Sequence, residues 1–351
     1  MPELAAQVLI ALIKAFIVVN AVLLAAASLV YVERRVAAWI QDRIGPNRVG
    51  PFGLLQPFAD VIKLYFKEDL VPAVADRAYH RLAPLISITV ALSLYAVIPI
   101  ADAVVIGGER VPISVAPHIN VGLLYILAMT SLGVYGIVLA GWSSNNKYSL
   151  LGGLRSSAQM ISYELTLGLS ILGVVMVAGT LDLADIIARQ KHVWNVVYQP
   201  LGFLLFLVAS FAETNRAPFD LPEAEPELVG GYHTEYSGMK FGLFFLAEYS
   251  NMVVASLMMV TLFFGGWHVP FVPDLPQWLG LREGSLGLAL FQAAVTLTKT
   301  AFFLFLFIWV RWTVPRFRYD QLMRLGWRTL LPLALVNILL TGVVLLVVNA
   351  R

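Results

Sequence analysis

Residues 5–30 read AAQVLIALIKAFIVVNAVLLAAASLV, and this stretch decides the class of fold. It carries one charged side chain, Lys14. Because a helix of about 20 mostly apolar residues crosses a bilayer, the stretch predicts a transmembrane helix. Together with seven similar stretches it predicts an all-α polytopic membrane protein, one membrane domain over residues 1–351 with about eight transmembrane helices. The predicted spans are residues 5–30, 82–103, 121–141, 156–178, 197–213, 240–264, 288–311 and 329–349.

The composition excludes several classes of protein. The chain is 59% hydrophobic and 13% charged, whereas a soluble domain carries about a quarter charged residues. Lys and Arg number 24 against 22 Asp and Glu, which leaves no basic excess for nucleic acid. The sequence has no cysteine, so it offers no thiolate for an iron–sulfur cluster. Its five histidines are too scattered along the chain to predict a metal site, and we expect none.

The distribution of Lys and Arg predicts the orientation of the chain. Most of them fall in the loops that join the first span to the second, the third to the fourth, the fifth to the sixth and the seventh to the eighth. Cytoplasmic loops of membrane proteins are enriched in these residues. We therefore expect the long loops in the cytoplasm and both termini on the opposite side.

The first of these loops, residues 31–81, contains a predicted amphipathic helix. Within residues 54–67, LLQPFADVIKLYFK, the apolar side chains recur at the spacing of one helical face. The segment is too short and too charged to span, so we expect it to lie in the membrane interface. It is either a plain anchor or a helix that frames an opening for a lipid-soluble molecule.

The loop at residues 213–239 is acidic, against the usual trend of cytoplasmic loops. Arg216 is the one fixed positive charge among its carboxylates. The loop is either a solvated acidic segment or a partly desolvated one in which some carboxylates hold protons near neutral pH. The carboxylates are Glu213, Asp220, Glu223, Glu225, Glu227 and Glu235.

Two more carboxylates lie inside predicted spans. Glu164 and Glu248 each come about eight residues after a cytoplasmic start, which places them roughly 12 Å below that surface. With Glu213 they form one predicted layer of acidic groups. Carboxylates at this depth are costly and mark functional candidates, although each also has the simpler interpretation of a hydrogen bond between helices. Lys299 in the seventh span is a possible counter-charge or proton carrier.

Four long strings carry a resemblance to a known family. The chain resembles the H-type membrane subunits of the proton-translocating NADH:quinone oxidoreductase, respiratory complex I, in its bacterial form. The strings cover about a third of the chain. They are ERRVAAWIQDRIGPNRVGPFGLLQPFADVIKLYFKE (33–68), GWSSNNKYSLLGGLRSSAQMISYE (141–164), AETNRAPFDLPEAEPELVGGYHTEYSGMKFGLFFLAEYSNM (212–252) and WVRWTVPRFRYDQLM (309–323).

The resemblance implies a role as the membrane anchor of the peripheral electron-transfer arm, with the wall and the entrance of the quinone chamber. The entrance would be framed by residues 5–30, 54–67 and 240–264. The family's chamber residues correspond to Glu33, Arg34, Arg43, Asp60 and Phe241. Its acidic path, which couples quinone reduction to proton pumping, corresponds to Glu164, Glu213, Glu223, Glu225, Glu227, Glu235 and Glu248.

The resemblance also implies cofactors and partners. Quinone would be the substrate, and FMN and iron–sulfur clusters would belong to partner subunits, so this chain is not a complete catalyst alone. The partners would be the quinone-site subunits of the peripheral arm, antiporter-like membrane subunits and lipid of the bacterial inner membrane. Three alternatives stay open: the related anchor subunit of a membrane-bound hydrogenase, a stand-alone ion transporter, and a passive scaffold.

Overall fold

The computed structural model describes residues 2–106, 109–116, 118–220, 228–269, 272 and 274–349. Most of these residues are helical, and the described strands form one two-stranded antiparallel hairpin. The elements are α1 (Pro2–Ile40), η1 (Pro51–Gly53), α2 (Gln56–Phe66), α3 (Arg77–Ser93), η2 (Leu94–Ala96), β1 (Ala103–Ile106), β2 (Glu109–Pro112), α4 (Gly122–Ser143), α5 (Lys147–Ala178), α6 (Leu183–Arg189), α7 (Asn195–Tyr198), α8 (Pro200–Glu213), η3 (Gly231–His233), α10 (Gly238–Phe263), α11 (Leu275–Trp278), α12 (Leu286–Thr313), α13 (Tyr319–Arg324), η4 (Leu325–Leu330) and α14 (Leu331–Asn349).

The all-α membrane fold is confirmed. Within the described part of the chain, six helices are long and apolar enough to cross a membrane: α1, α4, α5, α10, α12 and the continuous run from α13 to α14. The other two predicted spans correspond to α3 and α8, which have 17 and 14 residues. The prediction for residues 82–103 placed the end of the second helix too late, because the helix gives way to η2 before Pro99 and the chain then enters the hairpin.

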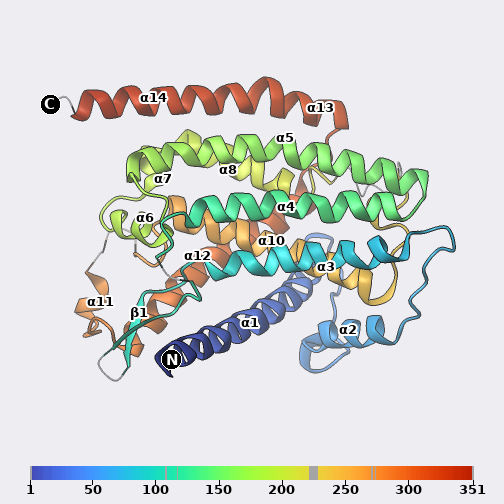
Figure 1. Ribbon diagram of the computed structural model, residues 1–351, viewed down its shortest axis with the longest axis horizontal. Helices are drawn as coiled ribbons and strands as arrows, with labels where there is room; N and C mark the ends of the chain where they lie inside the picture. The colour runs from blue at the N-terminus through green and yellow to red at the C-terminus, as the bar shows by residue number, and fades with distance from the viewer. Residues whose placement is uncertain are drawn as a thin grey trace.

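The long helices run side by side along the length of the molecule (Figure 1). Helix α10 lies at the centre and contacts α1, α3, α8 and α12. This central position explains why 72% of the apolar 18-residue stretch of α10 is buried inside the protein. The corresponding stretch of the outer run from α13 to α14 is 17% buried. The start of α1 and the end of α14 lie at the end of the bundle that carries β1 and α6, whereas α2 lies at the opposite end.

A buried polar contact ties α14 to the rest of the bundle. Gln199 at the start of α8 accepts a hydrogen bond from Asn337 at 2.9 Å and donates one to Thr341 at 2.8 Å. The helices approach closely here because Gly173 has no side chain: a Cβ at that position would lie 2.6 Å from Oε1 of Gln199. Polar side chains in lipid need such partners, so this contact specifies where α14 packs.

Helix α2 is the amphipathic helix that the sequence predicted between residues 54 and 67, and it contacts both α1 and α10. Its apolar side chains stay exposed in the isolated chain, with Phe58, Ile62 and Phe66 all more than half exposed. An amphipathic helix with an uncovered apolar face is typical of the membrane interface.

Candidate functional site

A buried arginine joins three separate segments of the chain. Arg216 follows α8, and its Nη1 donates to both carboxylate oxygens of Glu33 on α1, at 3.1 and 3.0 Å. Its Nε lies 2.6 Å from Oε1 of Glu248 on α10. The side chains of Arg216 and Glu33 are only 3% and 6% exposed. Glu33 and Glu248 are 215 positions apart in the sequence, so the arginine fixes the relative positions of α1 and α10.

Two further side chains complete this group. Arg311 near the end of α12 forms an ion pair with Oε1 of Glu33, and the hydroxyl of Tyr249 donates to Oε2 of Glu33 at 2.6 Å. The guanidinium of Arg216 also lies over the ring of Tyr249, 4.4 Å from its centre. We call Glu33, Arg216, Glu248, Tyr249 and Arg311 the arginine cluster. The cluster places two guanidinium groups beside two carboxyl groups, and charged groups that leave water need such partners.

The segment after α8 holds Arg216 in place through backbone contacts. Asn215 adopts a left-handed conformation with φ 49°, which turns the chain out of the helix. Gln159 of α5 supports this turn, because its amide donates to the carbonyls of Ala212 at 2.8 Å and Phe219 at 2.9 Å. Gln159 of α5 therefore helps to position the segment that carries Arg216.

A second ion pair lies beside the cluster. Asp220 accepts a hydrogen bond from Nη2 of Arg316 at 3.1 Å, and its side chain is buried. Burial raises the pKa of the Asp220 carboxyl above its usual range, although Arg316 opposes this shift. The acidic loop is therefore partly desolvated at this point.

A small cavity lies between α3, α4, α5, α8 and α10. Its volume is about 80 Å³, and both Glu213 and Glu248 line it, together with Thr214, Asn215 and Asn251. A buried water needs roughly 10–15 Å³ of such volume, so the cavity has room for a few waters but not for a quinone ring with its tail. The two carboxylates thus border the same cavity, whose other lining side chains are mostly apolar.

Glu164 lies next to this cavity without lining it. It accepts a hydrogen bond from Ser131 of α4, and it is close enough to Glu213 for their charges to interact. The three carboxylates that the sequence placed in one layer are thus neighbours, although Glu248 differs from the other two because it has an arginine partner.

The five predicted chamber residues do not form one group. Glu33 belongs to the arginine cluster, whereas Arg34 pairs with Asp60 at 2.6 Å and so joins α1 to α2. Arg43 is exposed and donates to Gln41 at 2.7 Å. Phe241 packs against the rings of His233 and Phe245 at the start of α10.

The remaining acidic-loop residues divide into two sets. Glu235 accepts a hydrogen bond from the amide of Asn146 at 2.6 Å, which attaches the end of the loop to the start of α5. Burial lowers the pKa of the neighbouring His233 to about 4. Glu223, Glu225 and Glu227 lie outside the described residues.

Lys299 is not the counter-charge of these glutamates. Its ammonium donates to the carbonyls of Phe264, Gly266 and His268 at 2.7, 2.8 and 2.6 Å, just beyond the end of α10. Glu248 lies 15 residues before the end of that helix, which at 1.5 Å per residue is about 22 Å away. Among the described residues, the counter-charge of Glu248 is Arg216, and Arg311 pairs with the neighbouring Glu33. Sequence reasoning missed both arginines as site residues. The signal for Arg216 was its position as the one fixed cation in the acidic loop.

Comparison with known proteins gives a consistent family. The family model described as NADH dehydrogenase matches residues 13–342. NADH-quinone oxidoreductase subunit 8 of Rhodothermus marinus is 59% identical over 331 residues, which is 93% of this chain and 94% of the relative. A NADH-quinone oxidoreductase subunit of Salinibacter ruber is 55% identical over 94% of this chain and 95% of the relative, and one of Geobacter metallireducens is 52% identical over 99% of both. The chain therefore belongs to the NADH dehydrogenase family and is a multi-pass membrane subunit of NADH-quinone oxidoreductase.

Proposed function

We propose that this subunit forms the membrane wall of the site where quinone is reduced, and that the arginine cluster transmits the resulting change of charge. The single observation that carries the proposal is the pair of contacts from Arg216 to Glu33 and Glu248. The guanidinium of Arg216 between two carboxylates is the proposed two-state element, and Arg311 is the second cation beside Glu33. If either carboxylate takes a proton, the arginine pairs more strongly with the other.

The entrance for quinone in this proposal lies between α1, α2 and α10. The uncovered apolar side chains of α1 and α2 support it, since a long isoprenoid tail needs an apolar passage from the bilayer. The Arg34–Asp60 pair holds α2 beside α1 at that opening. Arg43 and Phe241 flank the same end of the helices and are proposed as contacts of the chamber or of the docked peripheral arm.

The proposed coupling path runs from the arginine cluster to Glu213. Reduction of a quinone to a quinol adds two electrons and two protons, so the side chains that supply these protons are left with more negative charge near the loop at residues 213–239. Redistribution of Arg216 between Glu33 and Glu248 then alters the field at Glu213 across the cavity. Glu164 lies beside Glu213 and continues the proposed path toward antiporter-like membrane subunits. The proposed carboxylates of the path within the loop at residues 213–239 are Glu223, Glu225, Glu227 and Glu235.

We further propose the bacterial inner membrane as the location, with loops 31–81 and 213–239 on the cytoplasmic side and both termini on the other. The excess of Lys and Arg in the cytoplasmic loops as a group supports this orientation. The peripheral-arm subunits would dock on these loops and supply FMN and the iron–sulfur clusters. This chain has no cysteine with which to ligate such a cluster.

The test replaces Glu213 and Glu248 singly by Gln in the producing organism. We expect assembled complex with impaired inhibitor-sensitive NADH:quinone reduction or impaired proton pumping, because the carboxylates would no longer change charge. Blue-native gels measure assembly, and NADH oxidation with and without a quinone-site inhibitor measures reduction. Glu283→Gln is the matched control, since Glu283 is exposed and lines a separate cavity beside α6, at the other end of the bundle. Normal reduction and normal pumping in both test variants would contradict the proposal and favour a passive scaffold.

A further inference from the structure

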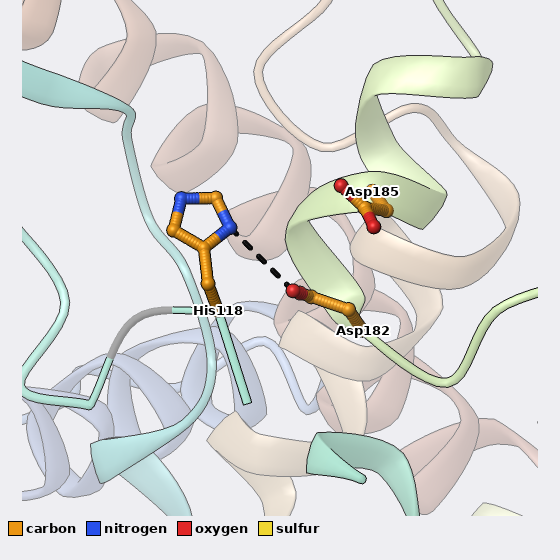
Figure 2. Close-up of side chains that lie close together, drawn as sticks. All are labelled: His118, Asp182 and Asp185. Carbon is orange, nitrogen blue, oxygen red and sulfur yellow. Dashed lines mark ion pairs between the residues drawn. The ribbon is translucent and has the colours of Figure 1, made fainter. Parts of the chain in front are cut away.

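A histidine and two aspartates come together at the end of the bundle opposite to the arginine cluster (Figure 2). His118 lies in the loop before α4, whereas Asp182 immediately precedes α6 and Asp185 lies in its first turn. One ligand atom from each residue lies within 4.8 Å of the other two. We propose that these three residues bind a divalent transition-metal ion, for which zinc is the best match. The proposed function above uses none of them.

The spacing of the first two residues fits a shared ion. Nδ1 of His118 lies 3.5 Å from Oδ2 of Asp182. A direct hydrogen bond between such atoms is shorter, at about 2.7–3.2 Å. Two ligands that each lie about 2.1 Å from a tetrahedral zinc ion are separated by roughly 3.4 Å. The distance between the imidazole nitrogen and the carboxylate oxygen is therefore that expected for two ligands of one metal ion.

The backbone of α6 orients the central carboxylate. Oδ1 of Asp182 accepts a hydrogen bond from the amide of Ala184 at 2.9 Å, and the side chain is buried. This contact leaves Oδ2 directed toward His118. Metal ligands are commonly held by such a second contact, which fixes their orientation before the ion binds.

The carboxylate of Asp185 can reach the same metal ion. Asp185 follows Asp182 by three residues, so the two side chains lie on the same face of the helix start. Asp185 is exposed, and its carboxylate can therefore change rotamer without disturbing the core. Figure 2 shows its oxygens on the side of α6 that His118 approaches.

The surroundings allow an ion to keep bound water. All three residues line a cavity of about 430 Å³, which exceeds the roughly 10–15 Å³ that one water requires. Lys191 lines the same cavity, but its ammonium lies 3.8 Å from a carboxylate oxygen of Asp274 and is paired there. A donor set with one imidazole favours zinc over magnesium or calcium, which prefer oxygen ligands alone.

No sequence pattern indicated this site. His118 and Asp182 are 64 positions apart, and the expectation that the chain has no metal of its own rested on the spacing of the histidines. An ion bound here would tie the loop before α4 to α6. The proposal replaces that expectation and does not depend on the quinone chemistry.

The experiment uses the whole complex, purified, stripped with a chelator and incubated with zinc chloride alone. After gel filtration, mass spectrometry measures zinc per mole of complex over a range of free zinc. We expect the wild type to hold one more zinc than His118→Ala and Asp185→Asn, with binding at this site weakened about tenfold or more in each variant. Both replaced side chains are exposed, so both variants should assemble. Asp182 is left unchanged because it also supports the start of α6.

Glu283→Gln is the matched control, because it removes a carboxylate that lines the same cavity outside the cluster. It should bind zinc as the wild type does. Equal zinc content in the wild type, His118→Ala and Asp185→Asn would overturn the site. Millimolar magnesium should leave the extra zinc in place, and its displacement by magnesium would overturn the assignment to a transition metal.

Discussion

Arg216 and Lys299 are both cations in the interior of the helix bundle, yet they are stabilised in different ways. Arg216 lies between two carboxylates, Glu33 and Glu248, either of which can gain or lose a proton. Lys299 donates to three backbone carbonyls, which never change charge. In the proposed function the first arrangement has two states of similar charge balance, whereas the second has one. The comparison teaches that an intramembrane charge indicates a switch only when its partners are themselves titratable.

Removal of Arg216 should have the largest effect. Arg216→Ala leaves two buried carboxylates without their shared partner, and breaking a buried ion pair costs about 3–5 kcal/mol. We expect loss of assembled complex on blue-native gels. Arg216→Lys keeps the charge and should retain more complex. Normal assembly and thermal stability in Arg216→Ala would mean that the cluster does not hold α1 and α10 together.

Removal of Lys299 should affect stability and spare coupling. Lys299→Met removes three hydrogen bonds from the end of α10, for which we expect a loss of about 3 kcal/mol, measured as a lower melting temperature of the complex. The number of protons pumped per NADH should stay at the wild-type value. An unchanged melting temperature with abolished pumping would instead make Lys299 a proton carrier, and the contrast with Arg216 would fail.

Removal of the Tyr249 hydroxyl should have an intermediate effect. Tyr249→Phe deletes the hydrogen bond to Glu33 at 2.6 Å and keeps the ring under Arg216. A hydrogen bond to a charged group contributes about 1.5–3 kcal/mol, so we expect an assembled complex with slower quinone reduction and a shifted pH profile. A pH–rate profile identical to that of the wild type would show that Glu33 is not part of the switch.

The smallest effect is expected at the exposed ion pair between Arg34 and Asp60. Arg34 is about half exposed, and an exposed ion pair contributes roughly 0.2–1 kcal/mol. Asp60→Asn should therefore leave assembly and melting temperature almost unchanged. If the pair positions α2 at the quinone entrance, the KM for a long-tailed quinone should rise more than the KM for a short-tailed analogue. Equal KM values for wild type and variant with both quinones would remove Arg34 and Asp60 from the entrance.

The fold could be predicted from sequence because lipid imposes a simple rule. A stretch such as residues 5–30 must be a helix in a bilayer, since no other local structure pairs its backbone there. The amphipathic helix followed from the spacing of its apolar residues in the same way. The hairpin of β1 and β2 did not, because short strands outside the hydrocarbon region obey no such constraint.

The candidate site was only partly predictable. Glu164, Glu213 and Glu248 were visible because a carboxylate within an apolar stretch stands out in any sequence. Their partners were not, because Arg216 and Glu33 are 183 positions apart and no local pattern links them. The group of His118, Asp182 and Asp185 could not be predicted for the same reason. Pairings over such distances are set by helix packing, which the sequence of one chain does not reveal.

The most direct measurement of the central claim is the number of protons pumped per NADH oxidised. The complex with Glu248→Gln is reconstituted in liposomes, with Glu283→Gln as the control. If Arg216 acts as a switch between Glu33 and Glu248, the Glu248→Gln complex pumps fewer protons per NADH, or reduces quinone too slowly to pump, while the control matches the wild type. A wild-type ratio at a wild-type rate in Glu248→Gln would contradict the account.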